Sequence, residues 1–550
     1  MDNHASANIS SSPYETAAVS MTLNDPGLIR WLITAQHRDG SWGGKIPLAA
    51  DRLLQSMMVV RALLDDQARN EQQEELTDAI VGGSEYIINR LASWRDEELN
   101  IADLCGFELL VPAHHSALER AGLMLPPLPE TLLARQRRKL ALLPPDAYYD
   151  PRLSNLHHSL EALDGNLHNY DLGRLEDLLF ADGSLASSPS ATAFLLRQPQ
   201  VSEAACKRMR AYLDAARNPD GGYSPTYPLD QVVLLWQLYF ERMVTSSSLL
   251  HARLLWMLAR LKPGKGVGAN ALFVADGDDT AVAALLATEF GLEYQALDLA
   301  ATLMRDFFDA GSGHFRTYRA ELTASPTTSA HAVEALVMLL KHGLGSAAER
   351  AHWQAALVGV ADYLVEHLWV ADKWHVSKYY SILRLTHSIS ELVSLHGQVP
   401  GLEALNQNWV HLRRELRVRL LAEQDVSGGW GDCGQPTVEE TAYATLTLLR
   451  LRIHDQAWFA ALRRSRDFLS TSGGRGMAEM WIDKTLYQAE GIISSAVHAA
   501  LGLLGKELGN TPRVRRSGLP RAAVSPCLKA GALAALKIGN SVTLQEQNHG

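Results

Sequence analysis

Cysteine is scarce in this sequence, where only Cys105, Cys206, Cys433 and Cys527 occur and lie far apart. They lack the paired spacing of a zinc site and the density of a disulfide framework. The chain also lacks a run of about 18 uncharged apolar residues that could span a membrane. Residues 1–12 are polar and contain no apolar core of a signal peptide. We therefore expect a soluble, cytoplasmic protein with reduced thiols.

An excess of positive charge is also absent. The 51 lysines and arginines are outnumbered by 61 aspartates and glutamates, which gives a net charge of -10. This balance argues against a broad nucleic-acid-binding surface, so a phosphate-bearing ligand would need a local basic pocket. The length of 550 residues, 47% of them hydrophobic, predicts several domains or a repeat architecture.

Strand patterns are few, and most of the chain shows apolar residues at helical spacing. A helix that is rich in small residues and begins with Ser or Thr recurs roughly every 50 to 57 residues. Its copies start at Thr280, Ser329, Thr386, Thr441 and Ser495. This period suits pairs of helices, and it predicts an all-α fold of α/α barrels in which small residues let the inner helices approach one another.

Two turns share the pattern Gln-x3-Gly-x-Trp, at residues 36–42 and 424–430, and residues 218–223 are a weaker copy. Glycine allows the turn, glutamine can hydrogen-bond exposed helix ends, and tryptophan can cover them. We interpret these turns as structural clamps.

Composition and repeat phase divide the chain into two helical units, 27–261 and 262–505, with Pro263-Gly264-Lys265-Gly266 between them. Residues 506–550 carry arginine among proline, glycine and alanine. We expect them to form a poorly ordered C-terminal extension.

The segment Asp276-Gly277-Asp278-Asp279-Thr280 places three carboxylates in four positions, directly before the apolar helical stretch 281–292. Like charges this close cannot all ionise easily, so at least one proton should be retained near neutral pH. A general acid is one interpretation. The other is an acidic helix start, because Asp is a good N-cap and carboxylates in a first turn gain from the helix dipole.

Six further short segments occur in a fixed order around these aspartates: Tyr14-Glu15-Thr16-Ala17, Gly106-Phe107-Glu108-Leu109, Leu156-His157-His158-Ser159-Leu160-Glu161, Asp372-Lys373-Trp374-His375, Glu439-Glu440-Thr441-Ala442-Tyr443 and Trp481-Ile482-Asp483-Lys484. With the aspartate segment, they give the chain a resemblance to the class II terpene cyclases. It most resembles bacterial diterpene cyclases of the copalyl diphosphate synthase type. The resemblance spans nearly all of residues 13–504.

The resemblance implies two α-barrel domains with the active site between them. Residues 1–26 and 262–505 would form the β domain, and residues 27–261 would form an inserted γ domain. It also implies protonation of the terminal alkene of a prenyl diphosphate, ring closure through carbocations and final proton loss, with the diphosphate retained. Asp278 would be the general acid, while Asp276 and Asp279 would orient it and tune its proton.

Aromatic faces can stabilise carbocations, and a diphosphate needs positive partners. The resemblance places a diphosphate-binding lysine near the basic cluster at 135–139, for which we choose Lys139. Core packing of the aromatic residues and a solvated helix face for the basic cluster are the competing interpretations. The candidates for substrate binding are Lys139, Arg137, Trp374, Lys373, Tyr443 and Lys484.

The acidic stretch before residue 106 resembles the segment through which these cyclases bind magnesium. Carboxylate oxygens suit Mg²⁺, which usually bridges to phosphate oxygens. The implied ligands are Glu97, Glu98 and Asp103.

The chain departs from the family pattern at two places. His158 matches a histidine that pairs with an asparagine to hold the water accepting the final proton, but Ser224-Pro225-Thr226 replaces the asparagine segment. His158 is thus either part of a changed base or a structural histidine. Ser329 stands where an asparagine often supports the catalytic acid, and it could hydrogen-bond Asp278 directly or through water.

The leading hypothesis is a class II cyclase that converts geranylgeranyl diphosphate into a bicyclic copalyl-type diphosphate. Farnesyl diphosphate, giving a drimenyl-type product, is the alternative within the same chemistry. A squalene-type cyclase, a protein prenyltransferase β subunit and a non-enzymatic helical scaffold fit the motifs less well. An Asp-Asp-x-x-Asp run for class I ionisation is missing. The oligomeric state stays open, a homo-oligomer included.

Overall fold

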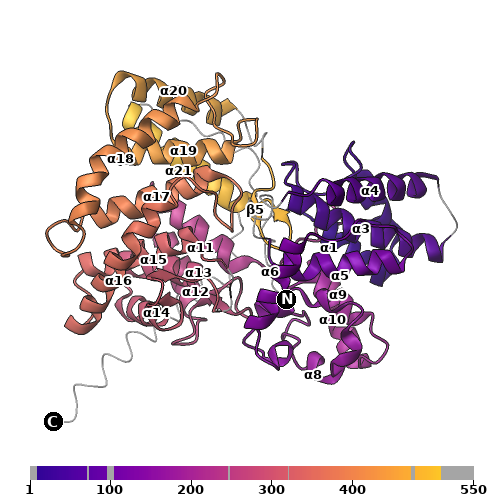
Figure 1. Ribbon diagram of the computed structural model, residues 1–550. Helices are drawn as coiled ribbons and strands as arrows, with labels where there is room; N and C mark the ends of the chain where they lie inside the picture. The colour runs from indigo at the N-terminus through magenta and orange to yellow at the C-terminus, as the bar shows by residue number, and fades with distance from the viewer. Residues whose placement is uncertain are drawn as a thin grey trace, which may run out of the picture.

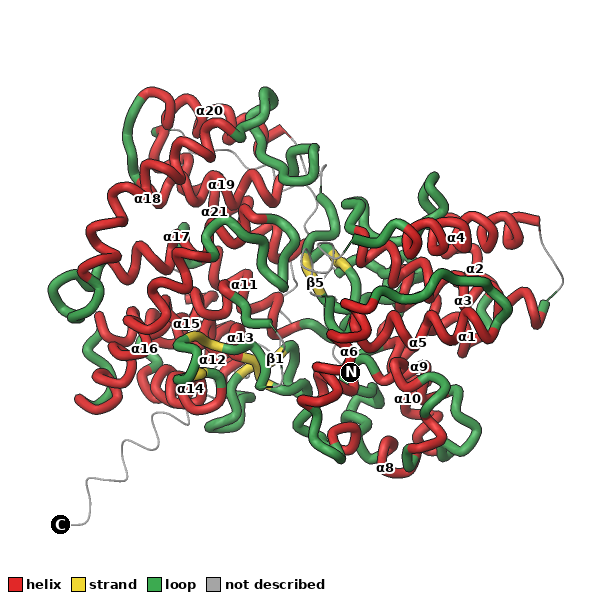
Figure 2. Tube along the Cα trace, viewed as in Figure 1, coloured by secondary structure: helices red, strands yellow, loops and turns green. Residues whose placement is uncertain are grey.

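The computed structural model describes residues 9–70, 74–95, 104–245, 248–319, 321, 323–471 and 477–509. These residues are mostly helical, as predicted, and their strands form only three two-stranded antiparallel pairs. Figures 1 and 2 show two helical bodies side by side, with strand β5 (Trp481–Ile482) where they meet. None of the helices in these ranges is long and apolar enough to cross a membrane.

The C-terminal body is a closed α/α barrel. Six inner helices each contact the next around a ring: α11 (Asp230–Glu241), α13 (Gly277–Glu289), α15 (Pro326–Lys341), α17 (Lys378–Val393), α19 (Val438–Leu451) and α21 (Glu490–Leu508). The outer helices are α12 (Ser248–Leu258), α14 (Glu293–Asp306), α16 (Ala347–Glu366), α18 (Glu403–Ala422) and α20 (Gln456–Thr471). The five recurring small-residue segments lie in α13, α15, α17, α19 and α21, which confirms the barrel interpretation for this half.

Short strands connect some of these helices. They are β1 (Val267–Gly268) with β2 (Ala275–Asp276), β3 (Phe308–Asp309) with β4 (His314–Phe315), and β5 with β6 (Leu486–Tyr487).

The N-terminal body is a smaller and less regular barrel. Its inner ring runs through α1 (Pro13–Leu23), α3 (Ala49–Arg69), α5 (Phe107–Arg120), the 3₁₀ helix η3 (Leu160–Leu163) and α9 (Pro189–Leu196), which contacts α1 again. The remaining elements are α2 (Pro26–Thr34), α4 (Glu74–Ala92), α6 (Glu130–Leu142), η2 (Ala147–Tyr149), α7 (Ser154–His157), η4 (Leu167–Asn169), α8 (Leu172–Glu176) and α10 (Glu203–Ala216).

The packing differs from the predicted domain limits at two points. Helices α11 and α12 were expected in the 27–261 unit, but their apolar residues, such as Leu235 and Leu254, belong to the core of the C-terminal barrel. Helix α1 was expected in the 262–505 unit, but Tyr14 and Ala17 belong to the N-terminal core. We therefore propose a boundary near residue 229, with α1 in the N-terminal body. Most of the predicted extension, residues 510–550, lies outside the described residues.

The two Gln-x3-Gly-x-Trp turns act as clamps, as expected. The amide of Gln36 donates to Gly40 O and Ala79 O, and that of Gln424 donates to Gly428 O and Ala461 O, all within 2.9–3.0 Å. The buried indole N–H of Trp42 donates a further hydrogen bond, to the carbonyl oxygen of Leu32. Each clamp thus ties the end of one helix to the second helix after it, α2 to α4 and α18 to α20.

The β5–β6 hairpin joins the two bodies. Its side chains alternate between the two cores, with Ile482 and Leu486 in the N-terminal core and Trp481 and Tyr487 in the C-terminal one. At its turn, the fully buried ammonium of Lys484 lies 3.0 Å from Glu15 Oε1 and 3.2 Å from Glu161 Oε1.

Three further oxygens of the N-terminal body surround this ammonium. It donates to Ser188 Oγ at 2.7 Å, to His158 O at 2.9 Å and to Ser190 Oγ. Burial alone would lower the pKa of Lys484, but Glu15 and Glu161 raise it above its ordinary value. The charge therefore stays on the lysine and anchors the hairpin to the N-terminal barrel.

We predict that Lys484→Met lowers the free energy of unfolding by about 3–5 kcal/mol, because Glu15 and Glu161 would stay buried without their cation. Urea denaturation followed by circular dichroism measures this change. Lys45→Met is the matched control, since Lys45 also bridges the bodies, to Glu479 at 3.8 Å, but is 67% exposed. We expect less than about 1 kcal/mol for the control. Equal effects of the two substitutions would contradict the anchoring role.

Candidate active site

The three aspartates lie at the N-terminus of inner helix α13. Asp276 is its N-cap, and its carboxylate accepts a hydrogen bond from the Asp279 amide at 2.7 Å. Asp276 and Asp279 are each only 4% exposed. The Asp278 side chain is 14% exposed, so it is the carboxyl of the three with most access to solvent. The acidic helix start is thus real, and it leaves Asp278 available for chemistry.

Burial keeps protons on this cluster. Burial raises the pKa of Asp276 to about 7. The charge of the neighbouring Asp278 also raises this pKa, whereas the hydrogen bonds from Asp279 lower it. Burial also raises the pKa of Asp279 well above its ordinary value, and the charges of Asp276 and Asp278 act in the same direction. The cluster can therefore hold a carboxylic acid at neutral pH.

The direct partner of Asp278 is His331. The Nδ1 atom of His331 hydrogen-bonds Asp278 Oδ1, and the fully buried ring packs edge-on against Trp236 with centroids 4.7 Å apart. The predicted direct hydrogen bond from Ser329 to Asp278 is not seen, because the Ser329 hydroxyl accepts from the Phe315 backbone N–H at 3.1 Å. His331 follows Ser329 by two residues on α15, so it faces a different direction and has the reach that serine lacks.

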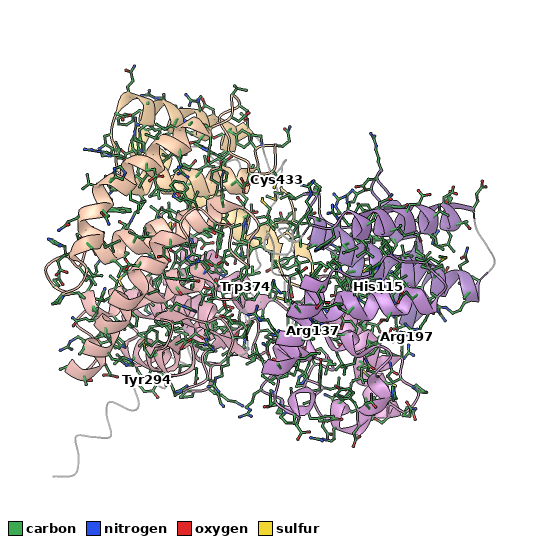
Figure 3. All side chains as sticks on the ribbon, in the orientation of Figure 1. His115, Arg137, Arg197, Tyr294, Trp374 and Cys433 are labelled. Atoms are coloured by element: carbon green, nitrogen blue, oxygen red, sulfur yellow. The ribbon has the colours of Figure 1, made fainter. Side chains whose placement is uncertain are left out.

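A cavity opens beside Asp278 between the two bodies. The volume of this cavity is about 120 Å³, and one side of it is open to solvent. Figure 3 shows Trp374 at the border between the bodies. The aromatic residues that line the cavity are Trp236, Phe273, Tyr318, Trp374, Trp481 and Tyr487.

A carboxylate outside the aspartate cluster, Asp483, lines the same cavity from the turn of the β5–β6 hairpin. His158 Nε2 lies 3.2 Å from Asp483 Oδ1, and Thr226 Oγ1 donates to Asp483 Oδ2. Burial alone would raise the pKa of Asp483, but His158, Thr226 and Lys484 lower it below its usual range. Thr226 comes from the segment that replaces the expected asparagine, so this part of the site is rebuilt around Asp483.

Two lysines, Lys139 from the N-terminal body and Lys373 from the C-terminal body, act electrostatically on Cys105, which lines the cavity. Burial lowers the pKa of the half-buried Lys139 on α6; Glu108 opposes this shift and Lys373 adds to it. Lys373 pairs with Glu321 and donates to Thr323 O at 2.8 Å. Burial raises the pKa of the Cys105 thiol, and the charges of both lysines act to lower it.

Three predicted substrate contacts lie elsewhere. Arg137 is 60% exposed and pairs with Glu130 on its own helix. The ammonium of Lys484 is enclosed in the buried ion cluster, away from the cavity lining. Tyr443 is buried behind the aromatic wall, where its hydroxyl donates to Glu439 Oε1 at 2.8 Å. In the described residues, none of the three lines the cavity, and each polar group has a partner within the fold.

The acidic segment with Glu97, Glu98 and Asp103 lies outside the described residues. Within the described part of the chain, no group of three or more His, Cys, Asp or Glu side chains is arranged to hold a metal ion.

Comparisons with known proteins agree with this geometry. The chain is 27% identical to the type B diterpene cyclase of Mycobacterium tuberculosis, over 90% of this chain and 96% of that one. It is 29% identical to a copalyl diphosphate synthase of Streptomyces cyslabdanicus, over 92% of this chain and 94% of that one. The fold matches ent-copalyl diphosphate synthase from Streptomyces platensis with a TM-score of 0.71 and 23% identity, over 90% and 96% of the chains. No family model matches the chain.

The double-barrel fold and these relatives confirm the resemblance, because the chain is similar to class II terpene cyclases over about nine-tenths of its length. Within them its homologues are bacterial diterpene cyclases and copalyl diphosphate synthases.

We predict that a carboxylic acid of the aspartate cluster titrates with a midpoint at about pH 7, the pKa of Asp276. Because the pKa is raised, the acid form persists to neutral pH and is lost as the pH rises further. Infrared spectroscopy of the protonated carboxyl band across this range measures the change. Asp276→Asn should remove that titration, and an unchanged band in the variant would contradict the assignment.

Proposed function

We propose that the protein is a diterpene cyclase that converts geranylgeranyl diphosphate into a bicyclic, copalyl-type diphosphate. The observation that carries this proposal is Asp278, a carboxyl held by His331 beside two proton-retaining aspartates and facing an aromatic-lined cavity. Relatives that match over about nine-tenths of the chain are named copalyl diphosphate synthase and labda-7,13-dienyl diphosphate synthase.

Asp278 acts as the general acid. Its Oδ1 accepts a hydrogen bond from His331 Nδ1, which leaves the other oxygen to carry the proton toward the substrate. A hydrogen bond from His331 would stabilise the carboxylate that forms when the proton leaves, so this contact favours transfer of the proton to the substrate. An alkene is a very weak base, and this stabilisation matters for its protonation.

The aromatic lining protects the cations that follow. The faces of Trp236, Trp374 and Trp481 can stabilise positive charge without forming a bond to it. These rings also exclude water, which would otherwise capture the cation before the second ring closes.

Lys139 and Lys373 are the proposed diphosphate partners. They come from different bodies and interact electrostatically with each other and with the cavity-lining Cys105. Together they would hold the charged head while the hydrocarbon tail reaches Asp278. The diphosphate is then a binding handle and is retained in the product.

Farnesyl diphosphate is the second candidate substrate. It offers the same terminal alkene to Asp278 and would give a drimenyl-type product. The relatives named for C20 products favour geranylgeranyl diphosphate.

We predict that Asp278→Asn lowers turnover of geranylgeranyl diphosphate by at least roughly a thousandfold, because the amide cannot supply the proton. Products should be found only after phosphatase treatment, with little inorganic diphosphate released. Gas chromatography with mass spectrometry measures the products, with farnesyl diphosphate compared in parallel. Asp467→Asn, at a side chain 72% exposed, is the control and should leave turnover unchanged. Release of diphosphate with a hydrocarbon product would refute the proposal.

A role for Mg²⁺ is part of the proposal, through Glu97, Glu98 and Asp103. Magnesium would neutralise part of the diphosphate charge when bound. We predict that removing Mg²⁺ with EDTA raises KM and changes kcat little, because Asp278 and not the metal ion supplies the proton. A steady-state titration with MgCl₂ tests this; loss of kcat at saturating substrate would contradict it.

A further inference from the structure

The pair formed by His158 and Asp483 bears on the last step of the reaction, the loss of a proton from the cyclised cation. The imidazole Nδ1 of His158 lies 3.0 Å from the carbonyl oxygen of Ala186. A carbonyl can only accept, so Nδ1 carries a hydrogen and donates. The other nitrogen, Nε2, faces Asp483 Oδ1 at 3.2 Å. An ionised carboxylate can also only accept, so this contact requires a hydrogen on Nε2 as well, and neither nitrogen of His158 then offers a lone pair to a substrate in the cavity.

Asp483 is held by donors on both oxygens and still lines the cavity. Oδ1 also accepts from the Lys484 backbone N–H at 2.7 Å, and Oδ2 accepts from Thr226 Oγ1. The backbone of Asp483 is fixed as well, since its carbonyl accepts from the Cys105 N–H at 2.9 Å. Its side chain keeps 16% exposure, and a carboxylate oxygen has two lone pairs, so Oδ2 can accept one more proton.

We propose that Asp483 is the catalytic base that ends the cyclisation, with His158 and Thr226 as its positioning residues. This inference rests on the proposed function. A C–H bond next to the cationic carbon breaks, its electron pair forms the carbon–carbon double bond, and the proton moves to Asp483 Oδ2. The proton then passes to solvent water where the cavity is open.

A weak base is well suited to this step. A proton next to a tertiary carbocation is extremely acidic, so a carboxylate can remove it although three donors stabilise its charge. A strong base in the same cavity would take the proton of Asp278 before the reaction starts. The donors around Asp483 thus keep it ionised and weakly basic at once.

The test compares the products of the full-length wild type and of Asp483→Asn with geranylgeranyl and farnesyl diphosphate. The amide cannot accept the proton, so the cation should be lost by other routes, as isomeric alkenes or as hydroxylated diphosphates. We expect the share of the wild-type product to fall roughly tenfold or more. The substrate should still be consumed, in contrast to Asp278→Asn. An unchanged product distribution would overturn the proposal.

Two further variants separate the base from its supports and cover the case in which Asp483→Asn folds poorly. Thr226→Val keeps the carboxylate but removes one donor, so a partial shift toward the same by-products is expected. His158→Gln retains a side-chain N–H for Asp483, and a smaller shift than in Asp483→Asn is expected. The opposite ranking, with His158→Gln more severe, would make His158 the base and overturn the proposal.

A structural role alone would lower stability and rate together and leave the product distribution unchanged, so thermal unfolding of each variant is measured beside its products. Wild-type protein that converts neither prenyl diphosphate would overturn the proposed function and this inference with it. Wild-type turnover with unchanged products in Asp483→Asn would overturn this inference alone.

Discussion

The buried ammonium of Lys484 is the contact on which the arrangement of the two barrels depends. A charge without access to water needs charged and polar partners, and here they come from the N-terminal barrel, as Glu15, Glu161, Ser188 and Ser190. Lys484 itself lies on a hairpin whose other residues pack into both cores. Once the ion cluster forms, the hairpin is fixed between the bodies. Because Asp483 precedes Lys484 directly, the same contact fixes a carboxylate in the cavity wall.

The cavity forms because both barrels contribute to its walls. The N-terminal body supplies Asn155, His158 and Thr226, and the C-terminal body supplies the aspartate cluster and most of the aromatic rings. Neither barrel alone encloses an apolar chain on all sides. Closing the walls with rings serves two demands at once, because aromatic faces exclude water and stabilise positive charge. The reaction therefore depends on the contact between the bodies as much as on the acid itself.

Much of this could be predicted from the sequence, for reasons that particular residues explain. Small residues at inner positions identified five of the six inner helices of the C-terminal barrel. The sixth, α11, escaped because its inner face carries Trp236, Tyr239 and Phe240, which do not follow the small-residue pattern. The aspartate segment pointed to Asp278 because three carboxylates in four positions are unusual. The sequence could not show that His331 and not Ser329 reaches Asp278, nor that Lys484 is enclosed, since both depend on how separate helices and the hairpin meet.

Two aspartate–histidine pairs face one cavity, and the groups that surround them differ. Asp278, bonded to His331, stands beside two further carboxyls buried with little compensation, so the cluster around it retains protons. Asp483, bonded to His158, accepts from a hydroxyl and a backbone N–H and has the charge of Lys484 close by, so it stays ionised. In the proposed reaction, one aspartate thus supplies a proton at the start and another accepts one at the end. The two surroundings differ in the balance between desolvation and hydrogen-bond donors, and at Asp483 the donors His158 and Thr226 come from the N-terminal barrel.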